Sequence, residues 1–145
     1  MGIWGFRDWG FGDLGIVNYK SFEELPCWQK ARDLCRAIFQ ITEESGLKKD
    51  YTLRDQIWRA AGSVMDNIAE GFDDGSAREC IRFLGYSQRS CGEVQSQLYR
   101  ALDSKYINQD QFSKIYELAS ECRKQIKGFR KYLRDYNSRA SRPNP

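Results

Sequence analysis

The chain has 145 residues, of which 41% are hydrophobic and 30% charged, and its formal net charge is +3. These values exclude a chain that is disordered by composition, and no stretch is long and apolar enough to cross a bilayer. We expect one soluble folded domain. We also expect a cytoplasmic protein, because the N-terminus has no basic and apolar leader.

The composition argues against chemistry at a metal or cofactor. The sequence contains no histidine, which is the commonest general base and the commonest transition-metal ligand. Its five cysteines are odd in number and form no Cys-x-x-Cys pair, which argues against a disulfide framework or a zinc site. We therefore expect no catalysis, cofactor or metal, and we expect most of the cysteines to pack in the core.

The N-terminal residues differ from the rest of the chain. Five of the twelve glycines fall in the first fifteen positions, and WGFRD at residues 4–8 is followed by WGFGD at 9–13. Glycine disfavours helix, so we expect residues 1–19 to be a disordered low-complexity extension. The alternative is an aromatic tail that stacks on a base or on a neighbouring subunit.

The first helix is predicted from about Pro26 to Glu44. Proline is tolerated in a first helical turn, and Gly46 ends the apolar pattern. The residues of its apolar stripe are Trp28, Ala31, Leu34, Cys35, Ile38, Phe39, Ile41 and Thr42. This stripe is wide enough to face two neighbouring helices.

The second helix is predicted from Thr52 to Gly71. Thr52 and Asp55 have the spacing of a capping box, and glycine is suited to the position just after a helix. The apolar face consists of Leu53, Ile57, Ala60, Val64 and Ile68. Small residues in its middle predict a close approach to the third helix.

Two further capping boxes mark the last two helices. Ser76 with Glu79 starts a third helix that runs to about Asp103, and Asn108 with Gln111 starts a fourth. The third helix is expected to bury Cys80, Phe83, Ser87, Cys91, Val94, Leu98 and Ala101. The fourth carries Phe112, Ile115, Ala119, Cys122, Ile126, Phe129, Leu133 and Tyr136 at alternating steps of three and four, typical of the seam of a bundle.

Short connections make consecutive helices antiparallel neighbours. The fold class predicted from these features is all-α, an antiparallel up-down-up-down four-helix bundle. The bundle domain is expected over residues 20–138, and residues 139–145 are expected to form a frayed tail.

Several segments resemble the bacterial four-helix-bundle family named for reading frames inside intervening sequences of 23S ribosomal RNA genes. They are QIWRAAGSV (residues 56–64), NIAEGF (67–72), FEEL (22–25), WQKA (28–31), RFL (82–84), SCGE (90–93) and QLYRAL (97–102). The resemblance covers roughly residues 20 to 136. Arg89 departs from the family pattern, because it stands where a glycine usually precedes the serine.

The resemblance implies a ring-shaped homopentamer without known catalysis. Relatives include the accessory variability determinant of diversity-generating retroelements, which partners a reverse transcriptase and binds nucleic acid through a basic surface. The positions that match the family motif are Arg59, Ser63, Asn67, Glu70, Gly71 and Glu93. We expect the polar members of this set, together with Asp66 and Gln97, to form an interhelical hydrogen-bond network. Asn67 and Glu70 are expected to fix the end of the second helix, and paired carboxylates for acid–base or metal chemistry are the alternative.

Basic residues gather near the C-terminus. Residues 123–142 contain eight Lys or Arg and one acid, whereas the rest of the chain has fifteen basic and nineteen acidic residues. We call six of these residues the basic stripe: Arg123, Lys124, Lys127, Arg130, Lys131 and Arg134. A phosphate backbone could follow the stripe, and the alternative is a solvated helix face that favours the negative end of the helix dipole. Arg59, Arg82 and Arg89 are expected to extend this surface only if oligomerisation brings them together.

The sequence predicts a non-enzymatic oligomeric adaptor that contacts RNA or DNA through the basic stripe. The expected partners are further copies of the chain, RNA or DNA, and a reverse transcriptase or another nucleic-acid enzyme, with no membrane. The first alternative is a protein-binding scaffold without a nucleic-acid role. The second is an enzyme that uses Asp and Glu with a divalent metal.

Overall fold

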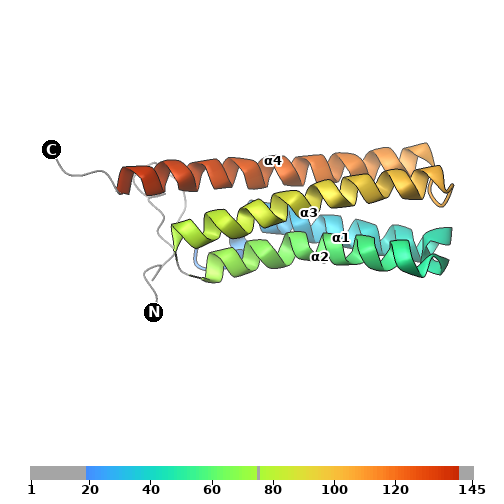
Figure 1. Ribbon diagram of the computed structural model, residues 1–145, viewed down its shortest axis with the longest axis horizontal. Coiled ribbons are helices and arrows are strands. Elements are labelled where there is room, and N and C mark those ends of the chain that lie inside the picture. The colour runs from blue at the N-terminus through green and yellow to red at the C-terminus, as the bar shows by residue number, and fades with distance from the viewer. Residues whose placement is uncertain (1–18, 75, 141–145) are drawn as a thin grey trace.

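The computed structural model describes residues 19–74 and 76–140, and within these ranges the chain is helical and contains no strand. The elements are the 3₁₀ turn η2 (Phe22–Glu24), α1 (Pro26–Glu44), the 3₁₀ turn η3 (Gly46–Lys49), α2 (Tyr51–Asp73), α3 (Ala77–Asp103) and α4 (Gln109–Ala140). The four helices lie side by side along one long axis, and consecutive helices run in opposite directions (Figure 1). The predicted four-helix bundle is confirmed. Residues 1–18 of the expected extension lie outside the described residues, as does most of the expected tail.

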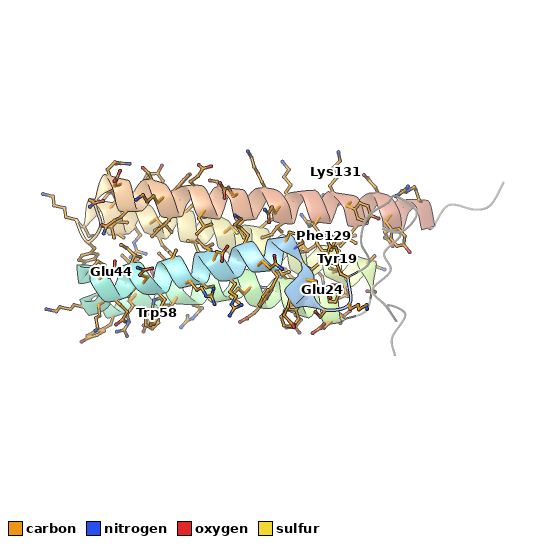
Figure 2. The ribbon with its side chains drawn as sticks, turned by 180° about the vertical axis from the view of Figure 1, so that it is seen from behind. Tyr19, Glu24, Glu44, Trp58, Phe129 and Lys131 are labelled. Atoms are coloured by element: carbon orange, nitrogen blue, oxygen red, sulfur yellow. The ribbon has the colours of Figure 1, made fainter. Side chains whose placement is uncertain are left out.

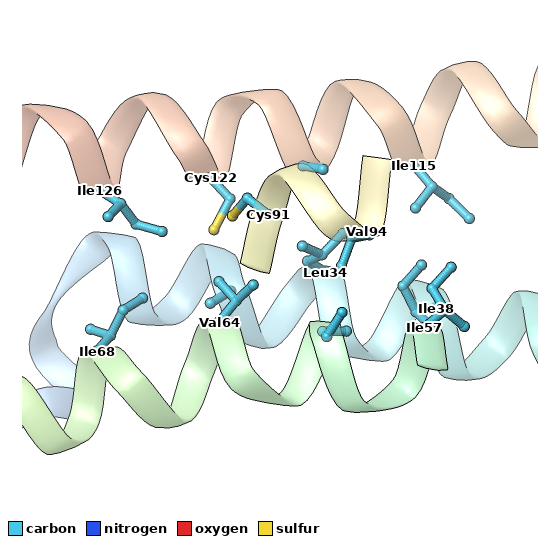
Figure 3. Close-up of a cluster of buried hydrophobic side chains, with 14 of the residues drawn as sticks. Leu34, Ile38, Ile57, Val64, Ile68, Cys91, Val94, Ile115, Cys122 and Ile126 are labelled. Atoms are coloured by element: carbon cyan, nitrogen blue, oxygen red, sulfur yellow. The ribbon is translucent and has the colours of Figure 1, made fainter. Parts of the chain in front are cut away.

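The core lies along the centre of the bundle. Each helix packs against two others, in the pairs α1–α2, α2–α3, α3–α4 and α1–α4. Side chains from all four helices meet there, among them Leu34, Ile57, Val94 and Ile126, each of them almost completely buried (Figure 3). No helix in the described part of the chain is apolar enough over a sufficient length to span a membrane.

The structure confirms the bounds predicted for α1. Pro26 occupies its first turn, and the helix ends at Glu44 before the 3₁₀ turn that begins at Gly46. One member of its predicted stripe was wrong: Phe39 is 56% exposed. Phe39 lies instead at the edge of the α1–α2 contact, where its ring centroid is 5.8 Å from that of Trp58.

The start of α2 differs from the prediction. The cap is Asp50, whose Oδ1 accepts a hydrogen bond from the Leu53 N–H at 3.1 Å, and Thr52 lies inside the first turn. Asp50 also accepts a hydrogen bond from the Tyr106 hydroxyl at 2.9 Å. These hydrogen bonds, from Leu53 first and then Tyr106, hold the pKa of Asp50 below its ordinary value. One carboxylate therefore caps α2 and links it to the turn between α3 and α4.

Gly71 does not end α2, which continues to Asp73. A Cβ atom at Gly71 would lie 2.8 Å from the Phe83 Cβ and 3.2 Å from the Cys80 Cα. Glycine is required here because the backbone of α3 passes against it, so its role is close packing and not a turn.

The predicted starts of α3 and α4 are confirmed. The Ser76 hydroxyl accepts a hydrogen bond from the Glu79 N–H at 3.1 Å. Asn108 and Gln111 form a reciprocal capping box, with bonds of 2.8 and 2.9 Å between the side chain of each and the N–H of the other. The fourth helix then extends to Ala140, past the expected end of the bundle domain at residue 138.

The prediction that most cysteines pack in the core is confirmed. Cys27, Cys80, Cys91 and Cys122 are buried, and Cys35 is half-buried. Burial raises the pKa of Cys27 from 9.0 to about 12. A hydrogen bond with Cys91, followed by burial, raises the pKa of Cys122. The thiols of Cys91 and Cys122 meet between α3 and α4 (Figure 3).

Candidate nucleic-acid interface

The basic stripe lies on the side of α4 that faces solvent and α3. Lys124, Lys127, Lys131 and Arg134 are exposed, and Lys131 points away from the other helices (Figure 2). Among the side chains that the structure describes, none of the six residues of the stripe forms an ion pair with a carboxylate. Their positive charge is therefore available to a ligand.

Arg130 reaches across from α4 to α3. Its Nε donates to the Ile81 carbonyl oxygen at 3.0 Å, and its Nη1 donates to the Gln88 Oε1 at 3.2 Å. The guanidinium lies directly over Gly85, so that a Cβ there would be 2.7 Å from Nη2. Partial burial, and then the charges of Arg134 and Arg89, lower the pKa of Arg130 from its ordinary value.

Arg123 repeats this arrangement one heptad earlier on α4. Its Nη1 lies 3.4 Å from the Gln95 Oε1 that accepts its hydrogen bond, and also 3.4 Å from the Cβ position of Gly92. Gln95 is itself held in place, because its Nε2 donates to the Ser120 hydroxyl at 2.9 Å. The contact with Arg123 is looser than the contact of Arg130 with Gly85.

The two contacts arise from a repeat in α3. The units Gly85-x-x-Gln88 and Gly92-x-x-Gln95 are seven residues apart, as are Arg130 and Arg123 on α4. A heptad brings residues back to the same side of packed helices. Since α3 and α4 are antiparallel, the earlier unit on α3 meets the later arginine on α4. In each unit glycine leaves room for the guanidinium and glutamine accepts a hydrogen bond from it.

Two arginines of α3 join this surface. Arg82 and Arg89 line a hollow of about 430 Å³ together with Gly85, Tyr86, Gln88, Arg123 and Arg130. We call it the arginine hollow. The expectation that Arg82 and Arg89 meet the basic stripe only through oligomerisation was wrong, because the antiparallel packing of α3 and α4 brings them together within one chain.

Tyr86 holds both arginines of α3 in position. The Arg89 guanidinium lies 4.8 Å from the centroid of the Tyr86 ring. Arg82 donates to the Tyr86 hydroxyl at 3.0 Å, and its other hydrogen bonds are to the Glu79 carboxylate. Hydrogen bonds to Glu79 and then to Tyr86 raise the pKa of Arg82. Glu79 therefore offsets one of the four positive charges of the hollow.

Arg59 does not belong to this surface. It lines a separate hollow of about 440 Å³ between α2 and α3, whose other lining residues are Gln56, Ala60, Ser63, Ser90, Glu93 and Gln97. Of the residues predicted to form a network between α2 and α3, Ser63 makes a hydrogen bond across the two helices, although its partner Ser90 was not predicted: the Ser90 hydroxyl donates to the Ser63 Oγ at 2.9 Å. Within the described parts of the chain, the buried Oε1 atom of Gln97 has no hydrogen-bond partner.

Asn67 and Glu70 do not fix the end of α2 as expected. Ser63 lies one turn before Asn67 in the same helix. The Asn67 amide donates to its carbonyl oxygen and to its hydroxyl oxygen, both at 2.8 Å. The Glu70 side chain is exposed and lines an open hollow with Asp66, Asp73 and Asp74. Within the described residues, no three acidic or cysteine side chains are close enough together to hold a metal ion.

Sequence reasoning missed Gly85, Gln88 and Gln95 as parts of the candidate interface. Their signal was present as the seven-residue repeat, but glutamine and glycine within a helix are ordinary until the opposing helix is placed. In the structure Tyr86 is half-buried beside two arginines.

Comparison with known proteins identifies the family. The family model described as 23S rRNA-intervening sequence protein matches residues 23–128, which include α1, α2, α3 and most of α4. The match ends before Arg130, and no curated protein matches the chain. Since the matched range covers well over half of the chain, the protein belongs to the 23S rRNA-intervening sequence protein family.

Proposed function

We propose that the protein is a non-enzymatic adaptor that binds RNA or DNA on the surface formed by the basic stripe with Arg82 and Arg89. One observation carries the proposal: cations from two helices share a surface on which, among the described residues, a single carboxylate, Glu79, is paired with them. Phosphate backbones are bound by such surfaces through the release of condensed counterions. In this role the protein works as a homo-oligomer in the cytoplasm, beside a reverse transcriptase or another nucleic-acid enzyme.

The proposal is tested by removing charge without disturbing the bundle. The chosen variant changes Lys124, Lys127, Lys131 and Arg134 to Gln, all of which are exposed. The matched control changes four other exposed residues to Gln: Lys48, Lys49, Lys105 and Lys114. These residues lie toward the opposite end of the bundle. Because each variant loses four positive charges, the change in net charge is the same. Both are titrated against a labelled RNA hairpin and a DNA duplex by fluorescence anisotropy at several salt concentrations.

The stripe variant is expected to bind more weakly than the control on every nucleic acid. The slope of log K against log salt should fall by about one for each phosphate that the variant can no longer neutralise. Equal weakening in the two variants would show that only net charge matters. No binding by the wild-type protein at low salt would overturn the proposal.

A protein-binding scaffold is the second candidate, and a specific feature favours it. Three aromatic side chains lie near one another at the edge of the α1–α2 contact: Phe39 is 56% and Tyr51 66% exposed, and Trp58 is half-buried. The Arg54 guanidinium lies 4.8 Å from the Tyr51 ring centroid and 5.3 Å from that of Trp58. Aromatic residues and arginine are both enriched at protein interfaces relative to the rest of the protein surface.

Self-association through these aromatic residues would resist salt, unlike phosphate binding. Analytical ultracentrifugation of the wild type and of a Phe39→Ser/Tyr51→Ser variant distinguishes the two surfaces. We expect an oligomer at both low and high salt that the variant weakens. A wild-type monomer at all concentrations would remove self-association from the proposal.

A further inference from the structure

We infer that the arginine hollow is a discrete phosphate-binding site, in which Gly85 and Gln88 position Arg130 and the guanidinium groups of Arg82, Arg89 and Arg123 complete the site. The inference rests on the proposed function for its ligand, a phosphate group of RNA or DNA. It goes beyond that function by placing one phosphate at one built site instead of spreading the attraction along the stripe.

Neutral groups hold the two arginines of α4 that line the hollow. Arg130 is bound by a backbone carbonyl and a glutamine amide oxygen, and Arg123 by a glutamine amide oxygen. These acceptors fix where each guanidinium lies without cancelling its charge. An arginine held by a carboxylate is already neutralised, whereas these two retain their attraction for an anion.

The hollow also concentrates positive charge. Four guanidinium groups line it, and Glu79 is hydrogen-bonded to only one of them. Like charges this close destabilise one another. Burial first, and then the charges of Arg134 and Arg89, lower the pKa of Arg130. An anion bound in the hollow relieves this repulsion between the guanidinium groups. The relief is absent in the free protein and therefore favours binding.

The donors of the hollow suit the chemistry of phosphate. Guanidinium groups present N–H donors in a planar fork that matches the oxygen atoms of phosphate, and such bonds are stronger than neutral ones. The Nε and Nη1 of Arg130 are already used within the protein, and Nη2 lies over Gly85 at the wall of the hollow. A single phosphate could therefore receive donors from both helices.

The hollow is continuous with the rest of the basic surface. The charge of Arg134, one helical turn after Arg130, contributes to the lowered pKa of Arg130. Lys127 and Lys131 lie on the same exposed part of α4. A ligand that carries further phosphates, such as a nucleic-acid strand, fits this arrangement better than a single free phosphate.

Gly85 offers a test that changes no charge. Its substitution by alanine places a Cβ 2.7 Å from Arg130 Nη2 and 3.0 Å from Cζ, so the end of this flexible side chain must move. Gly128→Ala is the matched control, since it adds the same methyl group to α4 and meets no atom within 4 Å. Arg130→Lys provides a second variant, which keeps the charge and loses the planar fork.

The experiment titrates the wild type and the three variants against the labelled RNA hairpin and DNA duplex, after circular dichroism has confirmed their helix content. We expect Gly85→Ala and Arg130→Lys to bind about tenfold more weakly, as for the loss of one charged hydrogen bond. The salt slope should stay nearly unchanged, and Gly128→Ala should bind like the wild type. Wild-type affinity in both Gly85→Ala and Arg130→Lys would overturn the inference.

That failure is distinguishable from failure of the proposed function. If the variant of the four exposed stripe residues loses binding while neither Gly85→Ala nor Arg130→Lys does, nucleic-acid binding stands and the hollow is not its site. If the wild type binds no nucleic acid, the nucleic-acid ligand is overturned. The hollow is then tested with inorganic phosphate, by following the Arg130 Nε–H resonance by NMR. A shift in the wild type that is absent in Gly85→Ala supports a site for free phosphate, and no shift overturns the site altogether.

Discussion

The two contacts that α3 makes, with α2 and with α4, use small residues in opposite ways. Against α2, Gly71 allows the backbone of α3 to approach, and the Ser87 hydroxyl donates to the Val64 carbonyl oxygen at 2.8 Å. Against α4, Gly85 and Gly92 of α3 allow long cationic side chains to lie across the helix. In the contact with α2, the absence of a side chain on glycine lets two backbones approach each other. In the contact with α4, it leaves room for the guanidinium groups of arginine side chains. We therefore expect the first contact to contribute mainly to stability, and we propose that the second serves mainly the binding of a ligand.

The largest effect on this comparison is expected from Gly71→Ala. The new Cβ would meet the Phe83 Cβ and the backbone at Cys80, which cannot move without shifting α3. Overpacking of this kind should lower the free energy of unfolding by about 1–3 kcal/mol. Urea denaturation measures the change, with Gly62→Ala in the same helix as the control. An unchanged midpoint for Gly71→Ala would show that α2 and α3 are not packed as closely as described.

High pH should weaken the packing around the buried thiol of Cys27. Burial raises the pKa of Cys27 from 9.0 to about 12. The unfolded chain therefore loses this proton first, so the stability present below about pH 9 is lost as the pH rises towards 12. The loss is about 1.4 kcal/mol per pH unit for such a thiol. Denaturation at several pH values should show a shallower decline for Cys27→Ala than for the wild type, and equal slopes would contradict the assignment.

Ser87→Ala tests the neutral hydrogen bond between α2 and α3. Ser87 is buried, and its substitution removes one bond to the Val64 carbonyl oxygen. We expect a decrease of about 1 kcal/mol in the free energy of unfolding, with nucleic-acid affinity unchanged. Ser96→Ala, at an exposed position of the same helix, is the control. A decrease of affinity in Ser87→Ala would show that the two contacts of α3 are coupled.

The smallest effects are expected where glycine has no packing role. A Cβ added at Gly62 or at Gly128 would have no atom within 4 Å of it. Alanine at either position should therefore only improve helix propensity. We expect the free energy of unfolding to rise by about 0.5–1 kcal/mol in each case. Thermal denaturation of the two single variants measures the gain. A clear decrease at Gly128 would reveal a contact on α4 and disqualify that variant as a control for Gly85→Ala.

The helices could be predicted from the sequence because their signals are local. Pro26 marks the start of α1, and the Asn108–Gln111 capping box sets the start of α4 through neighbouring atoms. The spacing of apolar residues also identified the buried face of α2. Phe39 was misplaced because an apolar side chain at the edge of a stripe can face solvent when a neighbouring ring covers one side of it.

The candidate interface could be predicted only in part, since it depends on how two distant segments pack. The basic stripe is visible within α4 alone, but Arg82 and Arg89 lie some forty residues away in the sequence. Their contact with the stripe follows from the register of α3 against α4. Gly71 illustrates the same limit: a glycine that ends a helix and one that admits a neighbouring backbone look identical in a single sequence.

The register of α3 against α4 also sets where the cationic track begins. Seven residues after Gly92 on α3 stands Tyr99, and seven residues before Arg123 on α4 stands Tyr116. These two tyrosines take the place of the glycine and the arginine, and their ring centroids are 5.7 Å apart. Cations therefore occupy one half of the α3–α4 edge and aromatic rings the other. From Arg123 to Arg134 the track extends about 16 Å along α4. A nucleic-acid strand bound there would contact only this short length of α4, and the cationic surface would end at the aromatic rings on one side. The two directions along the bundle would therefore not be equivalent for the strand.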